Sequence, residues 1–374
     1  MRIFVVGGAV RDRLLGLPVK DLDYVVVGST PLQMVQKGFR PVGQDFPVFL
    51  HPITQAEYAL ARTERKTAPG YKGFVFHADE NVTLEQDLAR RDLTINAMAQ
   101  AVDEAGQLVG EVIDPYGGQE DLRLKIFRHV GPAFVEDPLR VLRIARFAAR
   151  FFDFSIAPET LALLKNISAS GELKALVKER VWQELVKGLS AEKPSKMFST
   201  LMMCDAAKDV FHGMLDINYP VKFFDYVDAA ADQNMNLPQR YAALFHGLSG
   251  ELIESLSNQL SATVECKDYA VLAHQLVDGL LRYQTSPCAE NLLSILDRID
   301  VWRKPDRFAQ LLAVVELAAY PSSDLKKSYE LAKSVDVAMI AQTVGAKSHA
   351  NSGPAIKLAI WQARTQAIKQ GGFA

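Results

Sequence analysis

Short apolar runs separated by Gly and Pro characterise the first 135 residues of the chain. These runs lie at residues 3–6, 24–27, 47–50, 57–61, 93–101 and 111–113, and their lengths predict β-strands. Residues 63–81, by contrast, are polar and contain Pro69-Gly70. This composition predicts a long loop of the kind that often closes over a site.

The pattern becomes helical from Asp137 onward. Asp137 followed by Pro138 is typical of a helix start, with Asp as the N-cap and Pro in the first turn. Arginines then recur every three or four residues on one predicted helix face, at Arg140, Arg143, Arg146 and Arg150. We therefore predict an α+β chain: a mixed-sheet head with helices at residues 1–135, a helical neck at 136–195, and a helical body and tail at 196–374.

Composition adds few constraints. The 374 residues are 49% hydrophobic and 23% charged, with a net charge of −2, which is ordinary for a globular protein. The first apolar run is too short for a signal peptide, and no stretch approaches the roughly 20 apolar residues of a membrane span. Three scattered cysteines without metal-ligand spacing favour a reducing, cytoplasmic setting. After residue 299, Lys and Arg outnumber Asp and Glu by 10 to 6, a balance that suits either RNA contacts or a solvated helix face.

Candidate chemistry is concentrated near the N-terminus. Gly7-Gly8 follows an apolar strand and opens a helical stretch, a place where backbone N–H groups favour an anion. Arg11 can add a bidentate contact to phosphate. Asp21 and Asp23 are two residues apart, so a strand places them on one face, as a Mg²⁺ site beside a triphosphate requires. Taken singly, these parts also fit a plain turn, a solvated helix face and a polar strand start.

Further motifs continue this order through the first half of the chain. They are Arg90-Arg91-Asp92-Leu93-Thr94-Ile95-Asn96-Ala97, Asp114-Pro115-Tyr116-Gly117-Gly118, Glu136-Asp137-Pro138-Leu139-Arg140 and Glu179-Arg180. Together with the N-terminal motifs, they resemble the bacterial tRNA nucleotidyltransferase (CCA-adding) family, whose class includes bacterial poly(A) polymerases. The resemblance implies template-independent addition of CCA to tRNA from CTP and ATP. Poly(A) synthesis, addition of only C or only A, and a non-catalytic RNA-binding role stay open, as do monomer and homodimer.

The resemblance also implies roles for individual residues of the head. Asp21 and Asp23 would hold the catalytic Mg²⁺, and Glu57 is the candidate third carboxylate, chosen by its spacing to Arg62; it could instead pair with a basic side chain across strands. Gly8, Arg11 and Arg91 match positions that bind the triphosphate. For Arg91, the alternative is a surface salt-bridge cluster within Arg90-Arg91-Asp92.

Base selection is expected from the start of the neck. Asp137 and Arg140 lie one helical turn apart and can present an acceptor beside a donor. Cytosine and adenine both offer an amine donor beside a ring-nitrogen acceptor, whereas uracil and guanine present the reverse polarity. One Asp–Arg pair would therefore accept CTP and ATP. Arg143 resembles a further nucleotide contact, while Asp137 would also serve as a helix N-cap.

The second half departs from similar enzymes at His246-Gly247. Many of those enzymes have a metal-dependent phosphohydrolase domain marked by a His-Asp doublet, and here Gly247 stands in place of that Asp. The other histidines between residues 196 and 300 are His212 and His274, which lack ligand spacing. We therefore predict no phosphohydrolase activity and no transition metal there, and a helical region that holds the tRNA body, with the basic end after residue 300 as the contact zone.

Overall fold

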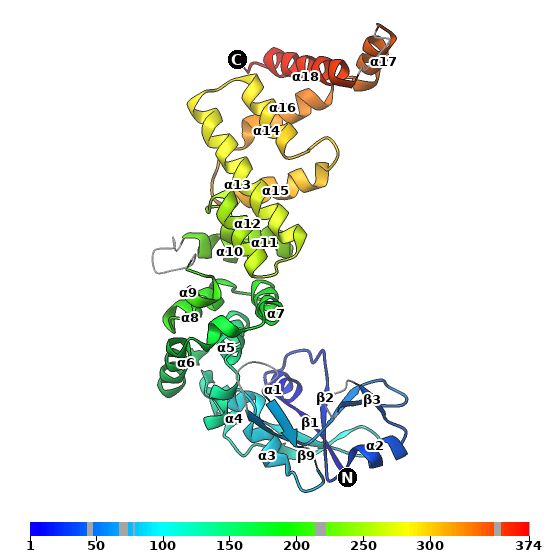
Figure 1. Cartoon of the computed structure of the whole chain (residues 1–374), viewed down its shortest axis with the longest axis vertical. Coiled ribbons are helices and arrows are strands. Elements are labelled where there is room, and N and C mark those ends of the chain that lie inside the picture. The colour runs from blue at the N-terminus through cyan, green and yellow to red at the C-terminus, as the bar shows by residue number, and fades with distance from the viewer. Residues whose placement is uncertain (43–47, 67–73, 78, 214–221, 348–352, 374) are drawn as a thin grey trace. The chain divides into compact units, whose positions relative to one another are not determined.

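The structure is a computed structural model that describes residues 1–42, 48–66, 74–77, 79–213, 222–347 and 353–373. It forms two compact units (Figure 1). Unit 1 comprises Met1–Leu185 and Lys196–Ile217, and unit 2 comprises Val186–Ser195 and Asn218–Ala374. The α+β fold class is confirmed, whereas the division into head, neck and body stays a prediction.

A mixed sheet forms the centre of the head in unit 1. Among the described residues it contains seven strands in the order β3-β4-β5-β2-β1-β8-β9. Its strands are β1 (Arg2–Val6), β2 (Asp23–Val27), β3 (Arg40–Val42), β4 (Val48–Leu50), β5 (Glu57–Leu60), β8 (Ala99–Val102) and β9 (Leu108–Ile113). All neighbouring pairs are antiparallel except β2 and β5, which are parallel. Alternating residues of the strands supply two buried clusters, one built around Val6 and Val25 and one around Val26 and Tyr58.

Helices and short strands complete unit 1. Those of the head are α1 (Gly8–Leu14), α2 (Pro31–Gln36), α3 (Leu84–Ala89), α4 (Gly118–Leu124) and the 3-10 helices η2 (Thr94–Asn96) and η3 (Pro132–Glu136). They are followed by α5 (Arg140–Arg150), α6 (Pro158–Ser170), η4 (Glu172–Ala175) and α9 (Ala207–Val210). β10 (Ile126–Phe127) pairs with β11 (Ser155–Ile156). Two helices cross the boundary between the units, α7 (Lys178–Leu189) and α8 (Ser195–Met203).

Unit 2 is helical in its described part. Its helices are α10 (Lys222–Asp232), α11 (Leu237–Phe245), α12 (Gly250–Gln259), α13 (Val264–Thr285), α14 (Ala289–Arg298), α15 (Pro305–Leu317), α16 (Ser323–Lys333), α17 (Val337–Lys347) and α18 (Gly353–Gln370). α11 is the most buried of these, because apolar residues on all its sides, such as Tyr241, Leu244 and Phe245, are covered. No described helix combines the length and apolar character that crossing a membrane requires.

Two predictions about local structure need correction. Residues 63–81 are not one long loop, because β6 (Thr63–Lys66) and β7 (Phe74–His77) pair as antiparallel strands; the Phe-Val-Phe run of β7 has high strand propensity. Pro69-Gly70 lies outside the described residues. The run at 93–101 is not a single strand, because η2 occupies Thr94–Asn96 before β8 begins.

Candidate functional site

The two aspartates lie at one end of β2, beside the glycine turn. In the antiparallel pairing of β1 and β2, Val6 is opposite Asp23. The chain therefore leaves β1 into Gly7-Gly8 at the same edge of the sheet where Asp21 and Asp23 lead into β2. Both aspartates are exposed, and the Gly7 N–H is held by the Met98 carbonyl, 3.0 Å away.

Glu57 is placed beside Asp23 by the sheet. Tyr24 pairs with Tyr58 in the parallel ladder of β2 and β5, so Asp23 and Glu57 are one residue back on neighbouring strands and share a face. Within the described part of the chain, no three His, Cys, Asp or Glu side chains are grouped closely enough to hold a metal ion. The donors nevertheless suit Mg²⁺, which is commonly held by one or two carboxylates together with substrate phosphates.

Arg91 approaches the glycine turn. Gly7 has a φ of +71°, and a Cβ on it would lie 2.8 Å from Nη1 of Arg91. Glycine is thus required at this position both by the backbone and by the approach of the guanidinium. Nη2 of Arg91 lies 3.3 Å from Asp87, and its buried Nε has no hydrogen-bond partner among the described residues. The turn and a cation predicted to bind phosphate are therefore brought together.

Arg11 is part of the protein interior. It is 3% exposed, and its Nε and Nη2 donate to Asp12 at 2.9 and 2.7 Å, while Nη1 donates to Asn96. Its guanidinium also lies over the rings of Phe147 and Phe151. Burial lowers the pKa of Arg11, and Asp12 opposes this shift. Since these partners are all protein groups, its contact with phosphate stays a prediction.

Asp92 is the acidic centre of a buried network. Arg143 reaches its Oδ2 through Nε at 2.8 Å and Nη2 at 2.7 Å, and Asn96 donates to Oδ1 at 2.9 Å. Burial alone would raise the pKa of this carboxyl, but Arg143 and Asn96 hold it below its ordinary value. Arg143 was expected to contact nucleotide; here it joins α5 to the segment that carries Arg91.

Two further arginines of the α5 stripe also have acidic partners. Arg146 lies 2.5 Å from Glu184, and Arg150 lies 2.8 Å from Asp12. Arg143, Arg146 and Arg150 are thus paired with carboxylates of the head and of α7, although the Arg150 side chain is still 41% exposed.

The Arg140 N–H donates to the Asp137 carbonyl at 3.0 Å, and the side chains of the two residues also contact other groups. Asp137 accepts from the Leu139 N–H at 3.1 Å and from Arg180 at 3.1 Å. Arg140 donates to the carbonyls of Ala133 at 3.0 Å and Arg90 at 2.5 Å. The expected helix start is two residues too early, because α5 begins at Arg140 with Leu139 as its N-cap. Asp137 still accepts an N–H of the entering turn.

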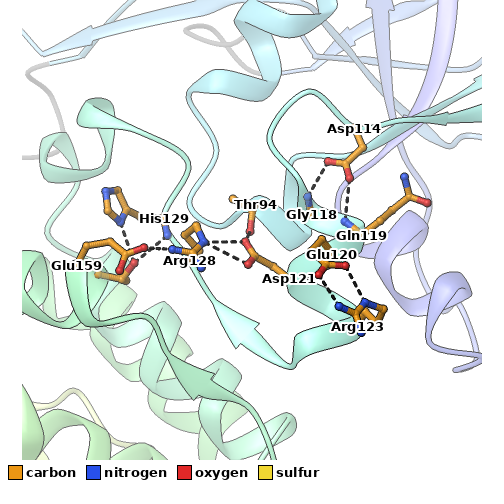
Figure 2. Close-up of polar contacts among 11 residues, drawn as sticks. Thr94, Asp114, Gly118, Gln119, Glu120, Asp121, Arg123, Arg128, His129 and Glu159 are labelled. Atoms are coloured by element: carbon orange, nitrogen blue, oxygen red, sulfur yellow. Dashed lines mark hydrogen bonds and ion pairs between the residues drawn. The ribbon is translucent and has the colours of Figure 1, made fainter.

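The Asp114 motif caps α4, the helix that packs against η2. Asp114 accepts the N–H groups of Gly118 and Gln119 at 2.7 and 2.8 Å and so caps α4 (Figure 2). A Cβ on Gly118 would lie 2.9 Å from the carbonyl carbon of Thr94, so glycine lets α4 pack closely on η2. Since η2 contains Asn96, the motif holds the residue that links Arg11 to Asp92.

A second carboxylate of α4 fixes η2 from its side. Asp121 accepts from the Thr94 hydroxyl at 2.7 Å and from Nε of Arg128 at 3.2 Å, and Arg128 also pairs with Glu159 (Figure 2). The roles of Asp92, Asn96 and Asp121 were missed from sequence. Asp92 and Asn96 lie within a motif noted in the sequence. Their structural roles could not be predicted from it, because their partners are far away in sequence.

In unit 2, the space beside Gly247 is filled by an aromatic ring. A Cβ on Gly247 would lie 2.6 Å from Cε1 of Phe223 and closer still to Cζ. His246 is 1% exposed, and its Nδ1 lies 3.0 Å from the Ala243 carbonyl. The other ring nitrogen, Nε2, is buried without a hydrogen-bond partner in the described residues. Burial lowers the pKa of His246.

A cavity of about 620 Å³ opens elsewhere in unit 2, between the N-terminal ends of α13 and α15. Its charged lining combines the basic Arg303, Lys304 and Arg307 with three acidic side chains. It contains none of the residues predicted to act on nucleotides. We therefore place the candidate active site at the sheet edge of unit 1, which carries the side chains predicted to bind metal and phosphate, and not at this cavity.

Comparison with known proteins defines the class first. A sequence-family model described as the poly(A) polymerase head domain matches residues 3–128. This part of the chain contains the glycine turn and the two aspartates. A second model, described as a probable RNA- and SrmB-binding site of polymerase A, matches residues 153–217. The chain is thus of the class of nucleotidyltransferases that contain the poly(A) polymerase head domain.

Whole-chain relatives define the family. Proteins of Burkholderia lata and Burkholderia ambifaria, both described as multifunctional CCA protein, are 47% and 48% identical to this chain, covering 99% of it and 98% of their own lengths. The chain belongs to the CCA-adding tRNA nucleotidyltransferase family.

Solved structures agree with this assignment. A CCA-adding enzyme in complex with CTP is 25% identical, with a TM-score of 0.70 over 98% of this chain and 87% of the other. A Thermotoga maritima CCA-adding enzyme complexed with tRNA, at 24% identity and a TM-score of 0.69, covers 99% of this chain and 87% of its own. The latter comparison supports the fold alone.

Proposed function

We propose that this chain adds CCA to the 3′ end of tRNA from CTP and ATP, without a nucleic-acid template and with release of pyrophosphate. The observation that carries the proposal is the sheet edge at which Gly7-Gly8, Asp21 and Asp23 meet. It provides a place for an anion and, beside it, two exposed carboxylates: Asp23 is the first residue of β2, and Asp21 lies two residues before that strand. The reaction belongs in the cytoplasm, where tRNA is matured.

Asp21 and Asp23 would hold Mg²⁺, with Glu57 as the third carboxylate. The metal would make the RNA 3′-hydroxyl more acidic and stabilise charge on the leaving pyrophosphate. Gly8 and Arg91 would bind the triphosphate at the turn. Arg11 would join them by exchanging part of its contact with Asp12 or Asn96 for a phosphate oxygen.

Asp137 and Arg140 would read the base. Their hydrogen-bonding groups interact with Leu139, Arg180 and two backbone carbonyls. Cytosine or adenine would replace some of these partners with its amine donor and ring-nitrogen acceptor, whereas uracil and guanine would leave buried groups unpaired, which costs affinity. Arg143 would make a further contact to the nucleotide, and its ion pair with Asp92 joins α5 to the segment that carries Arg91.

The helical unit 2 would bind the body of the tRNA. The contact zone would be the basic end after residue 300, which includes the exposed Arg303 and Lys304 beside the cavity. Contacts of this kind act on the RNA backbone and weaken with salt.

The function is tested with tRNA that lacks its terminal CCA, supplied with labelled CTP and ATP. Addition of C, C and A followed by a stop supports the proposal. Long A tracts would indicate a poly(A) polymerase, and addition of C alone or A alone a partial enzyme. No incorporation by folded protein would contradict the proposal.

A further inference from the structure

The sheet of unit 1 consists of two parts joined at one strand pair. β3, β4 and β5 form an antiparallel group, and the strand order connects this group to β1, β2, β8 and β9 through the pairing of β5 with β2. That pairing is parallel and covers three residue pairs, beginning with Tyr24 and Tyr58. Parallel pairing is slightly weaker per residue than antiparallel pairing. Contacts between side chains are therefore important for the stability of the β2–β5 pairing.

The two tyrosines at the start of the junction are stacked face to face. Their ring centroids are 4.3 Å apart, and their planes differ by 3°. Tyr58 is buried, and the rings of Phe39 and His51 lie against it at 5.1 and 5.6 Å. A slip of one residue would move Tyr58 to the other face of the sheet and break the stack.

Each of these tyrosines directly follows a carboxylate of the candidate site. Asp23 precedes Tyr24, and Glu57 precedes Tyr58. Because side chains alternate along a strand, the carboxylates share the face opposite to the rings, on strands about 4.8 Å apart. The register that stacks the rings is therefore the register that puts Glu57 beside Asp23.

We propose that the Tyr24–Tyr58 stack is a register clamp that holds Glu57 next to Asp23, which makes the two tyrosines positioning residues for the metal-binding carboxylates. The inference rests on the proposed roles of Asp23 and Glu57. It adds a determinant of the reaction that lies on the face of the sheet opposite to the two carboxylates.

The test compares Tyr58→Leu, Tyr58→Phe and the matched control Phe49→Leu. Phe49 is 2% exposed, pairs with Tyr58 across β4 and β5 and packs in the same cluster, but it does not border β2. We would measure Mn²⁺ binding by electron paramagnetic resonance with a non-hydrolysable CTP analogue, and thermal stability in parallel. Tyr58→Leu should weaken Mn²⁺ binding about tenfold, a change of about 1.4 kcal/mol. Tyr58→Phe keeps the stacked ring and should stay within about twofold of wild type.

Phe49→Leu separates positioning from general packing. It should lower the melting temperature by a similar amount while leaving Mn²⁺ binding unchanged. Equal loss of Mn²⁺ binding in Phe49→Leu, or full binding in a destabilised Tyr58→Leu, would overturn the clamp. If Tyr58→Leu does not fold, Tyr24→Leu takes its place with the same expectations, because Tyr24 is only half-buried.

A double-mutant cycle with Glu57→Gln tests the route of the effect. If Tyr58 acts through Glu57, adding Tyr58→Leu to Glu57→Gln should change Mn²⁺ binding little, whereas additive losses would contradict the clamp. The variant Asp23→Asn tests the proposed metal site itself, separately from the clamp. If that variant keeps full CCA addition and Mn²⁺ binding, the proposed site is wrong, whatever the tyrosines do.

Discussion

Two glycines of this chain make room for a neighbouring side chain, and the two neighbours differ in kind. At Gly7 in unit 1, the space is used by Arg91, whose guanidinium tip would lie 2.8 Å from a Cβ. At Gly247 in unit 2, the space is occupied by the ring of Phe223. The first glycine leaves a cation beside a turn that can receive an anion. The second glycine lets the apolar ring of Phe223 pack against the backbone.

The polar atoms near these glycines sharpen the contrast. Nε of Arg91 and Nε2 of His246 are both buried and lack a hydrogen-bond partner within the described residues. The Arg91 side chain is 19% exposed, so ligand can reach its remaining nitrogens, whereas His246 is 1% exposed among aromatic rings. The unpartnered atom of Arg91 thus belongs to a side chain that a ligand can reach, whereas that of His246 is enclosed.

The largest expected effect is on catalysis at the sheet edge of unit 1. Asp23→Asn removes a proposed metal ligand, and the lost charge stabilisation should lower the rate of C addition by about 10²–10³-fold. Because Asp23 is exposed, the melting temperature should stay within a few degrees of wild type. Single-turnover assays measure the rate, with Glu104→Gln, an exposed head position, as the control. A rate near wild type would remove Asp23 from the mechanism.

The next effect tests the approach of Arg91 to Gly7. Gly7→Ala combines a φ of +71° with a clash against the guanidinium. The displaced arginine should raise the KM for CTP about tenfold, and the backbone strain should cost about 1–2 kcal/mol of stability. Gly16→Ala is the matched control, since its φ is +69° and a Cβ there would meet none of the described atoms within 4 Å. Equal KM values in the two variants would show that strain alone explains the loss.

The third effect should appear in stability and not in activity. Gly247→Ala forces a methyl group into the ring of Phe223, and overpacking of this kind costs about 1–3 kcal/mol. Thermal unfolding should detect a lower melting temperature, while the rate of CCA addition at permissive temperature should match wild type. Phe223→Leu should partly rescue Gly247→Ala, because the smaller side chain can move aside. A loss of activity without a loss of stability would reverse the comparison and give Gly247 a role in the reaction.

The sequence predicted the strands and motifs of the head better than the strand pairings and side-chain contacts that they form. β1, β2, β5 and the aspartates were expected where they occur, because strand patterns and short motifs are local. The parallel pairing that brings Glu57 beside Asp23 joins segments more than 30 residues apart, and no local pattern encodes it. Arg11 was expected to face phosphate, yet Asn96, 85 residues away in sequence, takes one of its nitrogens. The loss of the Asp at position 247 was visible, whereas its replacement by the ring of Phe223 required the packed structure.

The smallest expected effect is the pH dependence of stability, which differs between the two regions. His246 has a pKa below its ordinary value of 6.5 when folded, so the unfolded chain binds its proton more tightly, and stability falls as pH drops below about 6.5. Asp92 has a pKa below its ordinary 3.8, so the stability it contributes is lost only below that pH. His246→Asn, which keeps a donor for the carbonyls but does not titrate, should therefore lose less stability than wild type between pH 7 and 5, as measured by thermal unfolding. Parallel curves for the two proteins would mean that His246 gains its proton in the folded state as easily as in the unfolded one, and that the aromatic enclosure is open to water.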